Sequence, residues 1–222
     1  MNDYFNSLEE NFKAEANTVR AQQQSAYMRN QFAFFGLTSP ERKLLSRPFL
    51  LRESLAPKSE LKKSVEYLFS KDERDFQHFA LDLAYKYIKL QEINDIEIYE
   101  HMILNKSWWD TIDFIAPKLV AQYFINFPEQ RDVCVNKWIE SNNIWLQRSA
   151  ILFQLKYKDK MDTVFLEYVI NKLNGGNEFF INKAIGWILR EHAKLDSNWV
   201  IDFVDRTELS NLSRREALKH FS

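Results

Sequence analysis

A repeated pattern is the feature of this sequence that most restricts its fold. Three segments open with an aromatic residue or Leu, continue with a polar pair and a small Ala, and then keep apolar residues at the helical period. They are FQHFALDLAYKY (76–87), LQRSAILFQLKY (146–157) and FINKAIGWILRE (180–191). Tyr87 and Tyr157 lie 70 residues apart, which is two units of 35. Repeats of this length made of paired helices are typical of α-solenoids such as HEAT and TPR proteins.

We therefore predict an all-α fold, a HEAT-like helical-repeat α-solenoid that curves around a concave face. The sequence shows no low-complexity linker and no shift of composition between its halves, so we expect residues 1–222 to form a single domain. The concave face of such a stack is where these folds bind extended partners.

Glycine is too scarce for several classes of site. The chain has 4 Gly and 5 Pro, against 18 Phe, 9 Tyr and 6 Trp. Phosphate-binding loops need several glycines at fixed offsets, because only glycine lets backbone N–H groups approach a phosphate closely. Three of the four glycines are Gly36 and the pair Gly175–Gly176, and Gly186 falls inside a helical pattern. A P-loop or Rossmann site is thereby excluded.

The charge and cysteine content add further limits. With 30 basic and 31 acidic residues, a nucleic-acid-binding face would require cations on the concave side and acids on the convex side. The single Cys134 excludes an internal disulfide and a cysteine metal cluster, and we expect it to be a small buried hydrophobe. We expect no metal and no cofactor. The acidic start and the lack of an 18-residue apolar run predict a cytoplasmic protein that does not contact membranes. We also expect a monomer.

Local signals predict where some helices begin. Thr38 with Glu41, and Ser213 with Glu216, each have the spacing of a capping box at a helix N-terminus. The run Asn-Gly-Gly-Asn at 174–177 predicts a turn between two helices.

A 35-residue unit makes four polar positions equivalent on successive helices. These positions hold His78, Asp113, Arg148 and Lys183. Residues four apart share a helix face, so several neighbours join them. The expected stripe consists of Trp109, Asp113, Arg148, Lys156, Lys183, Trp187 and Arg190. Cations bind phosphates, and indole faces pack on sugars or cationic groups. Taken singly, each residue is better explained by core packing or a solvated surface, and only the joint register supports a phosphate-backbone site.

At these residues the sequence resembles the AlkD-type DNA alkylation repair glycosylases, which are bacterial HEAT-like-repeat enzymes. The resemblance covers essentially the whole chain. It is carried by YMRNQFAFFGLTSPER (27–42), KSWWDTID (106–113), NNIWLQRSAILFQLKYK (142–158), EFFINKAIGWILREHAK (178–194) and LSRREALKH (212–220).

The resemblance implies a monofunctional glycosylase that binds double-stranded DNA containing alkylated bases. Its expected reaction is hydrolysis of the N-glycosidic bond of 3-methyladenine or 7-methylguanine without extrusion of the base, which leaves an abasic site in base excision repair. The family's two tryptophans and aspartate match Trp109, Trp187 and Asp113, and its phosphate-contacting arginine matches Arg148. We expect further DNA contacts from Lys156, Lys183 and Arg190, with Tyr27 near the cleft.

Two other functions stay open at this point. One is a DNA-binding relative of the same fold that lacks catalysis, and the other is a HEAT-type protein scaffold. The intact set of Trp109, Asp113 and Trp187 favours the enzyme over the first. The mixture of aromatic and cationic residues in the stripe favours nucleic acid over a protein partner.

Overall fold

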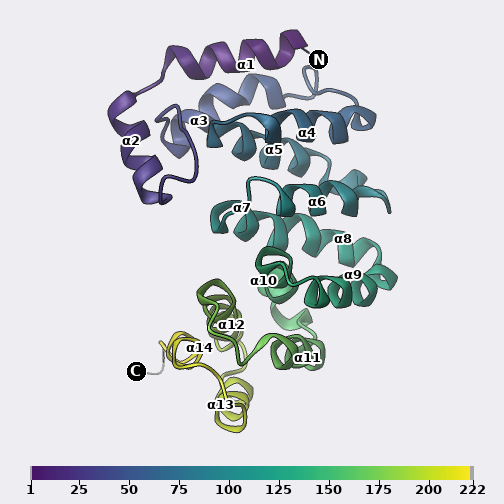
Figure 1. Ribbon diagram of the computed structural model, residues 1–222. Helices are drawn as coiled ribbons and strands as arrows, with labels where there is room; N and C mark the ends of the chain where they lie inside the picture. The colour runs from purple at the N-terminus through teal and green to yellow at the C-terminus, as the bar shows by residue number, and fades with distance from the viewer. Residues whose placement is uncertain (1, 221–222) are drawn as a thin grey trace. The chain divides into compact units, whose positions relative to one another are not determined.

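The computed structural model describes residues 2–220, in which α-helices follow one another along the chain (Figure 1). Within this range no strand forms, and an isolated bridge joins Ala33 and Glu73. The chain divides into two compact units, of which the first ends at Glu92 and the second begins at Ile93. The predicted all-α fold of the α-solenoid type is confirmed. The concave face and the single domain stay predictions.

The first unit packs its helices around a cluster of aromatic rings. The rings of Phe12, Phe35 and Phe76 contact one another with centroids 5.5 to 5.9 Å apart. Its elements are α1 (Asn2–Ala14), α2 (Thr18–Tyr27), α3 (Ser39–Ser46), η1 (Arg47–Leu50), η2 (Lys58–Glu60), α4 (Leu61–Ser70), α5 (Arg74–Lys86) and η3 (Ile88–Leu90).

The second unit is a longer series of helices, with α12, α13 and α14 gathered at its C-terminal end (Figure 1). Phe124 packs against both Trp138 and Phe153 in its core. Its elements are α6 (Asp95–Leu104), α7 (Trp109–Phe114), η4 (Ile115–Val120), α8 (Ala121–Asn126), α9 (Pro128–Glu140), α10 (Ile144–Leu152), η5 (Phe153–Lys156), η6 (Lys158–Lys160), α11 (Thr163–Leu173), α12 (Phe179–His192), α13 (Ser197–Arg206) and α14 (Asn211–Ala217).

The repeat length expected from the sequence is visible in the helix boundaries. Helices α5, α7, α10 and α12 begin at Arg74, Trp109, Ile144 and Phe179, each 35 residues after the one before. The four positions predicted to be equivalent are therefore each the fifth residue of a helix. They are His78, Asp113, Arg148 and Lys183.

Three tyrosines connect elements that are one repeat apart. Tyr87, Tyr123 and Tyr157 are spaced 36 and 34 residues apart, and each donates its phenolic proton to a backbone carbonyl 30 to 36 residues earlier. Tyr87 reaches Ala56, whereas Tyr123 reaches Ile93 at 2.6 Å and Tyr157 reaches Ala121 at 2.7 Å. Burial raises the pKa of Tyr123 to about 12 and raises the pKa of Tyr157 as well. The phenols thus remain neutral donors at physiological pH.

One of the two expected capping boxes is confirmed and the other is wrong. Thr38 caps α3, and the Glu41 side chain accepts the Thr38 backbone N–H at 2.7 Å. Helix α14, however, begins at Asn211, because Ser210 supplies the cap by accepting the Ser213 N–H at 3.1 Å. Ser213 therefore lies inside the helix, and the Glu216 carboxylate is free to make contacts with another helix.

Smaller expectations about single residues are also confirmed. Cys134 is buried, and Gly175 lies in the turn before α12 with a φ of 98°. Gly186 lies inside α12.

Among the described residues, none of the helices is long and apolar enough to cross a membrane. Within residues 2–220, no group of three or more His, Cys, Asp or Glu side chains is arranged to hold a metal ion.

We predict that Tyr157→Phe lowers the free energy of unfolding by about 1 kcal/mol, because it removes a partly buried hydrogen bond to Ala121. Urea denaturation followed by circular dichroism measures this change. Tyr168→Phe is the matched control, since the Tyr168 hydroxyl donates to Asn136 at the exposed surface. Equal losses in the two variants would contradict a structural role for the Tyr157 bond.

Candidate functional site

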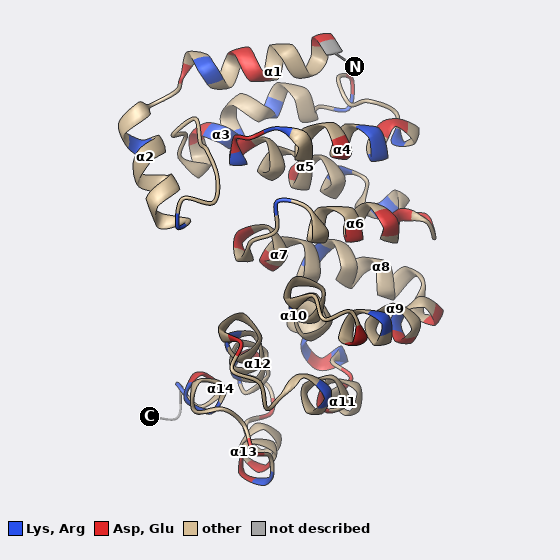
Figure 2. Cartoon of the chain, viewed as in Figure 1, with Lys and Arg blue, Asp and Glu red and all other residues tan. Residues whose placement is uncertain are grey.

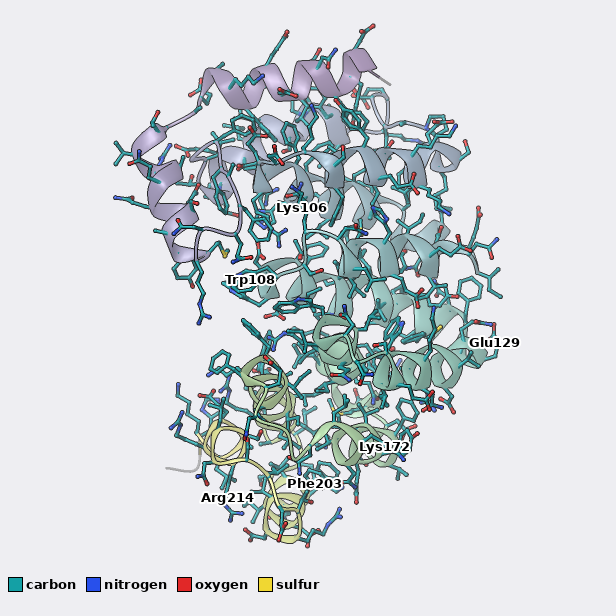
Figure 3. The ribbon with its side chains drawn as sticks, viewed as in Figure 1. Lys106, Trp108, Glu129, Lys172, Phe203 and Arg214 are labelled. Carbon is teal, nitrogen blue, oxygen red and sulfur yellow. The ribbon has the colours of Figure 1, made fainter. Side chains whose placement is uncertain are left out.

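The residues predicted for catalysis lie on helices of the second unit. Trp109 is the first residue of α7 and Asp113 the fifth, so the two side chains are one turn apart on the same helix face. Trp109 is partly exposed, and 19% of the Asp113 side chain is accessible. Lys106 and Trp108 lie on the loop that enters α7 (Figure 3). Helix α7 therefore presents an indole and a carboxylate side by side.

Arg148 binds the Asp113 carboxylate through two parallel hydrogen bonds. Its Nε donates to Oδ1 at 2.8 Å and its Nη2 donates to Oδ2 at 2.9 Å. Its Nη1 donates to the Phe180 carbonyl oxygen at 2.5 Å. Arg148 itself is only 3% exposed. One buried guanidinium on α10 thus connects α7 with the first turn of α12.

The environment of Asp113 changes its acidity in two opposing directions. Burial raises the pKa of the Asp113 carboxyl above its ordinary value, and the negative charge of Asp110 adds to this effect. The hydrogen bonds and positive charge of Arg148 act to lower the pKa of the same group. The carboxylate is therefore poorly solvated and depends on Arg148 for much of its stabilisation.

Three aromatic rings pack together where the loop that enters α7 meets α10 and α12. Trp108, Trp145 and Phe180 contact one another, with ring centroids 5.6, 5.3 and 4.8 Å apart in the three pairs. Phe180 contributes both its ring to this cluster and its carbonyl to Arg148. The sequence analysis did not predict this cluster. Trp145 and Phe180 are nevertheless 35 positions apart, and each is the second residue of its helix.

Trp187 lies on α12, two turns after Phe180 and four residues after Lys183. Its side chain is partly exposed, whereas the residues next to it in the sequence, Gly186 and Ile188, are buried. Because α12 packs against α10, the helix that carries Trp187 is fixed relative to Arg148. The structure therefore places the aspartate, both tryptophans and the arginine on three packed helices.

The predicted phosphate-binding cations differ in their surroundings. Lys183 and Arg190 both pair with Glu216 of α14, at 2.7 and 2.5 Å. Figure 2 shows acidic and basic residues on both α12 and α14. Lys156 is exposed, but it lies outside α10. The expectation that it shares a helix face with Arg148 is wrong, because the α-helix ends at Leu152 and a 3₁₀ turn follows.

Two other predicted residues lie elsewhere. Tyr27 ends α2 in the first unit, where it is 72% exposed, and its expected place near the cleft stays a prediction. His78 lies in α5 of the same unit, near the buried Asp75 carboxyl, whose pKa is raised by burial.

Comparison with known proteins assigns the family. The family described as "DNA alkylation repair enzyme" matches residues 8–221. The chain belongs to this family. A solved structure described as a predicted DNA alkylation repair enzyme from Enterococcus faecalis is 31% identical, with a TM-score of 0.86. The match covers 93% of this chain and 97% of that chain. Among curated proteins, none matches.

In this member of the DNA alkylation repair enzyme family, we predict that Arg148→Met lowers the free energy of unfolding at neutral pH by about 3 kcal/mol. The substitution leaves the Asp113 carboxylate largely buried without its partner. The loss should shrink as pH falls, because the pKa of Asp113 rises further in the variant and the protonated carboxyl needs no cation.

Urea denaturation at several pH values measures this effect. In the Arg148→Met background, Asp113→Asn should recover part of the stability, because it removes the unpaired charge. A loss that is independent of pH and unchanged in the double variant would contradict the coupling between the two side chains.

Proposed function

We propose that this chain is an AlkD-type monofunctional DNA glycosylase that releases cationic alkylated purines, such as 3-methyladenine and 7-methylguanine, from duplex DNA. The observation that carries the proposal is the Asp113 carboxylate, held by Arg148 through both oxygens with Trp109 one turn away on the same helix. Membership of a family of DNA alkylation repair enzymes supports the choice of substrate.

The carboxylate is suited to stabilise the charge that develops when this bond breaks. A purine alkylated at N3 or N7 is already cationic and leaves readily, so the reaction needs no acid on the base. Positive charge instead accumulates on the deoxyribose, where a fixed carboxylate near C1′ lowers the barrier and can orient the attacking water. Asp113 is fixed for this purpose because both of its oxygens accept hydrogen bonds from Arg148.

The tryptophans add a smaller contribution of the same sign. Indole faces attract cationic groups through their π electrons, by about 1 kcal/mol at partly exposed sites. Trp109 and Trp187 are both partly exposed, which leaves part of each side chain accessible to a deoxyribose. Because these groups act on the sugar rather than on the base, the base can remain stacked in the duplex during the reaction.

Binding of the phosphate backbone would be divided among several cations. Arg148 uses three of its N–H groups for Asp113 and Phe180, so any phosphate contact must use the remaining donors. Lys156 is exposed and available at the surface, and Lys183 keeps 39% of its side chain accessible. We propose that the DNA is contacted by Arg148, Lys156, Lys183, Arg190 and Tyr27.

A non-catalytic DNA-binding relative is the principal alternative, and activity measurements distinguish the two. We predict that the wild-type protein releases 3-methyladenine and 7-methylguanine from methylated duplex DNA. Asp113→Asn should reduce the single-turnover rate at least about a hundredfold, the usual effect of losing one preorganised electrostatic group. Chromatography of the released bases measures both rates.

Asp110→Asn is the matched control, because it removes the same charge from the same helix without touching the ion pair with Arg148. It should retain activity at neutral pH. No release by folded wild-type protein would contradict the proposed function. Equal rates for wild type and Asp113→Asn would contradict only the role given to Asp113.

The pH dependence of the reaction should report the ionisation of Asp113. Only the carboxylate stabilises the oxocarbenium-like state, so kcat/KM should fall as pH falls through the pKa of Asp113. Because burial raises this pKa, the decline should occur above the ordinary aspartate value of about 3.9.

Two variants should move the decline in opposite directions. Asp110→Asn removes a charge that raises the pKa and should shift the decline to lower pH, whereas Arg148→Met should shift it to higher pH. Rates are corrected for spontaneous depurination measured without enzyme. A pH profile that neither variant shifts would show that another group causes the decline of kcat/KM at low pH.

A further inference from the structure

Two cations that flank Trp187 on α12 share one carboxylate from α14. Glu216 Oε1 lies 2.7 Å from Lys183 Nζ, and Glu216 Oε2 lies 2.5 Å from Arg190 Nη1. Glu216 is 8% exposed, so its carboxylate lies mostly beneath the surface, between the two cations. The hydrogen bonds from Lys183 and Arg190 hold the pKa of Glu216 below its ordinary value. The group is therefore a permanent anion at physiological pH.

A glycine makes this arrangement possible. Gly186 lies on α12 between Lys183 and Arg190, at a point where α14 packs closely against it. A Cβ placed on Gly186 would lie 2.4 Å from Glu216 Cβ and 2.9 Å from the Ser213 carbonyl oxygen. Ser213 also donates to the Asn182 carbonyl oxygen at 2.9 Å, which fixes α14 along α12. The close packing of the two helices thus inserts Glu216 between the two cations.

The shared carboxylate uses the same chemistry as a DNA phosphate. Carboxylate and phosphate oxygens both accept charge-assisted hydrogen bonds from arginine and lysine. Lys183 keeps 39% and Arg190 19% of its side chain accessible, so solvent reaches both cations while Glu216 remains bound to them. A phosphate that approaches Trp187 must compete with Glu216 for these donors.

We infer that Glu216 is an internal counterion that competes with the DNA backbone for Lys183 and Arg190 and so weakens the protein's grip on DNA of any sequence. This inference rests on the proposed function, because it requires that DNA binds along α12. With Glu216 in place, the three side chains carry one net positive charge, and without its negative charge they carry two. The effect applies equally to damaged and undamaged DNA, because phosphates carry no information about the base.

The test measures binding of a fluorescently labelled, undamaged DNA duplex as a function of salt concentration. Glu216→Gln keeps the shape of the side chain and removes its charge. The variant should bind about threefold to tenfold more tightly at low salt, and its plot of log affinity against log salt should be steeper by about 0.9, the value for one additional neutralised phosphate.

Glu167→Gln is the matched control. Glu167 on α11 accepts from Arg206 of α13 through both oxygens, at 2.6 and 2.7 Å, so the substitution changes the net charge of the protein equally at another pair. A steeper slope in Glu216→Gln but not in Glu167→Gln is the expected result. Equal slopes in the two variants, or weaker binding by Glu216→Gln, would overturn the inference.

Two further variants extend the test, and the second of them keeps it decisive if Glu216→Gln folds poorly. The double variant Glu216→Gln, Lys183→Gln restores one net charge and should return the slope to the wild-type value. Lys183→Gln alone, a change at a partly exposed position, should give weaker binding and a slope shallower by about 0.9. A wild-type slope for Lys183→Gln would contradict competition at this site.

Excision assays on the same proteins separate the two proposals. Wild-type protein that binds DNA in a salt-dependent way but releases no base would contradict the glycosylase and leave the role of Glu216 standing. Active wild-type protein with no specific effect of Glu216→Gln would contradict only the role of Glu216. Wild-type protein that does not bind duplex DNA would overturn both.

Discussion

A single buried guanidinium determines how the central helices of the second unit are arranged. Arg148 cannot remain charged in an apolar interior without hydrogen-bond partners, and three of its donors bind Asp113 of α7 and the Phe180 carbonyl of α12. These bonds fix α7, α10 and α12 together, and the rings of Trp108, Trp145 and Phe180 close the same junction with apolar contacts. The candidate catalytic carboxylate is thus positioned by the interaction that holds the unit together.

The sequence contained the repeat and its polar positions but not the contacts between them. A spacing of 35 predicted that Asp113 and Arg148 occupy equivalent places, and their helices begin 35 residues apart. Equivalent residues of successive repeats face each other because the repeats stack, so their opposite charges could have predicted the pair. Arg148 was instead expected to face DNA, since a sequence shows a charge without its partner. Glu216 does not occupy one of the equivalent positions of the 35-residue repeat, and the sequence analysis assigned it to a capping box with Ser213 instead.

The remaining differences arise where backbone geometry changes locally. Lys156 lies two turns beyond Arg148 only on an uninterrupted α-helix, and α10 ends at Leu152. Some turns also could not be recognised from glycine, because other residues adopt the left-handed backbone conformation there. Before α7, α10 and α12 this conformation occurs at Lys106, Asn142 and Gly175, with φ of 46°, 55° and 98°. Asparagine tolerates this conformation, whereas lysine adopts it at a cost of about 1 kcal/mol.

The tyrosine bonds also restrict how this chain can change its length. Each phenol must meet a carbonyl about one repeat earlier, as Tyr123 meets Ile93 and Tyr157 meets Ala121. One residue inserted within a helix turns every later side chain by about 100°, which would point the tyrosine away from its acceptor. A residue inserted in a loop leaves the faces of both flanking helices unchanged. Insertions and deletions among relatives of this chain should therefore concentrate in the loops, while the helices keep a constant length.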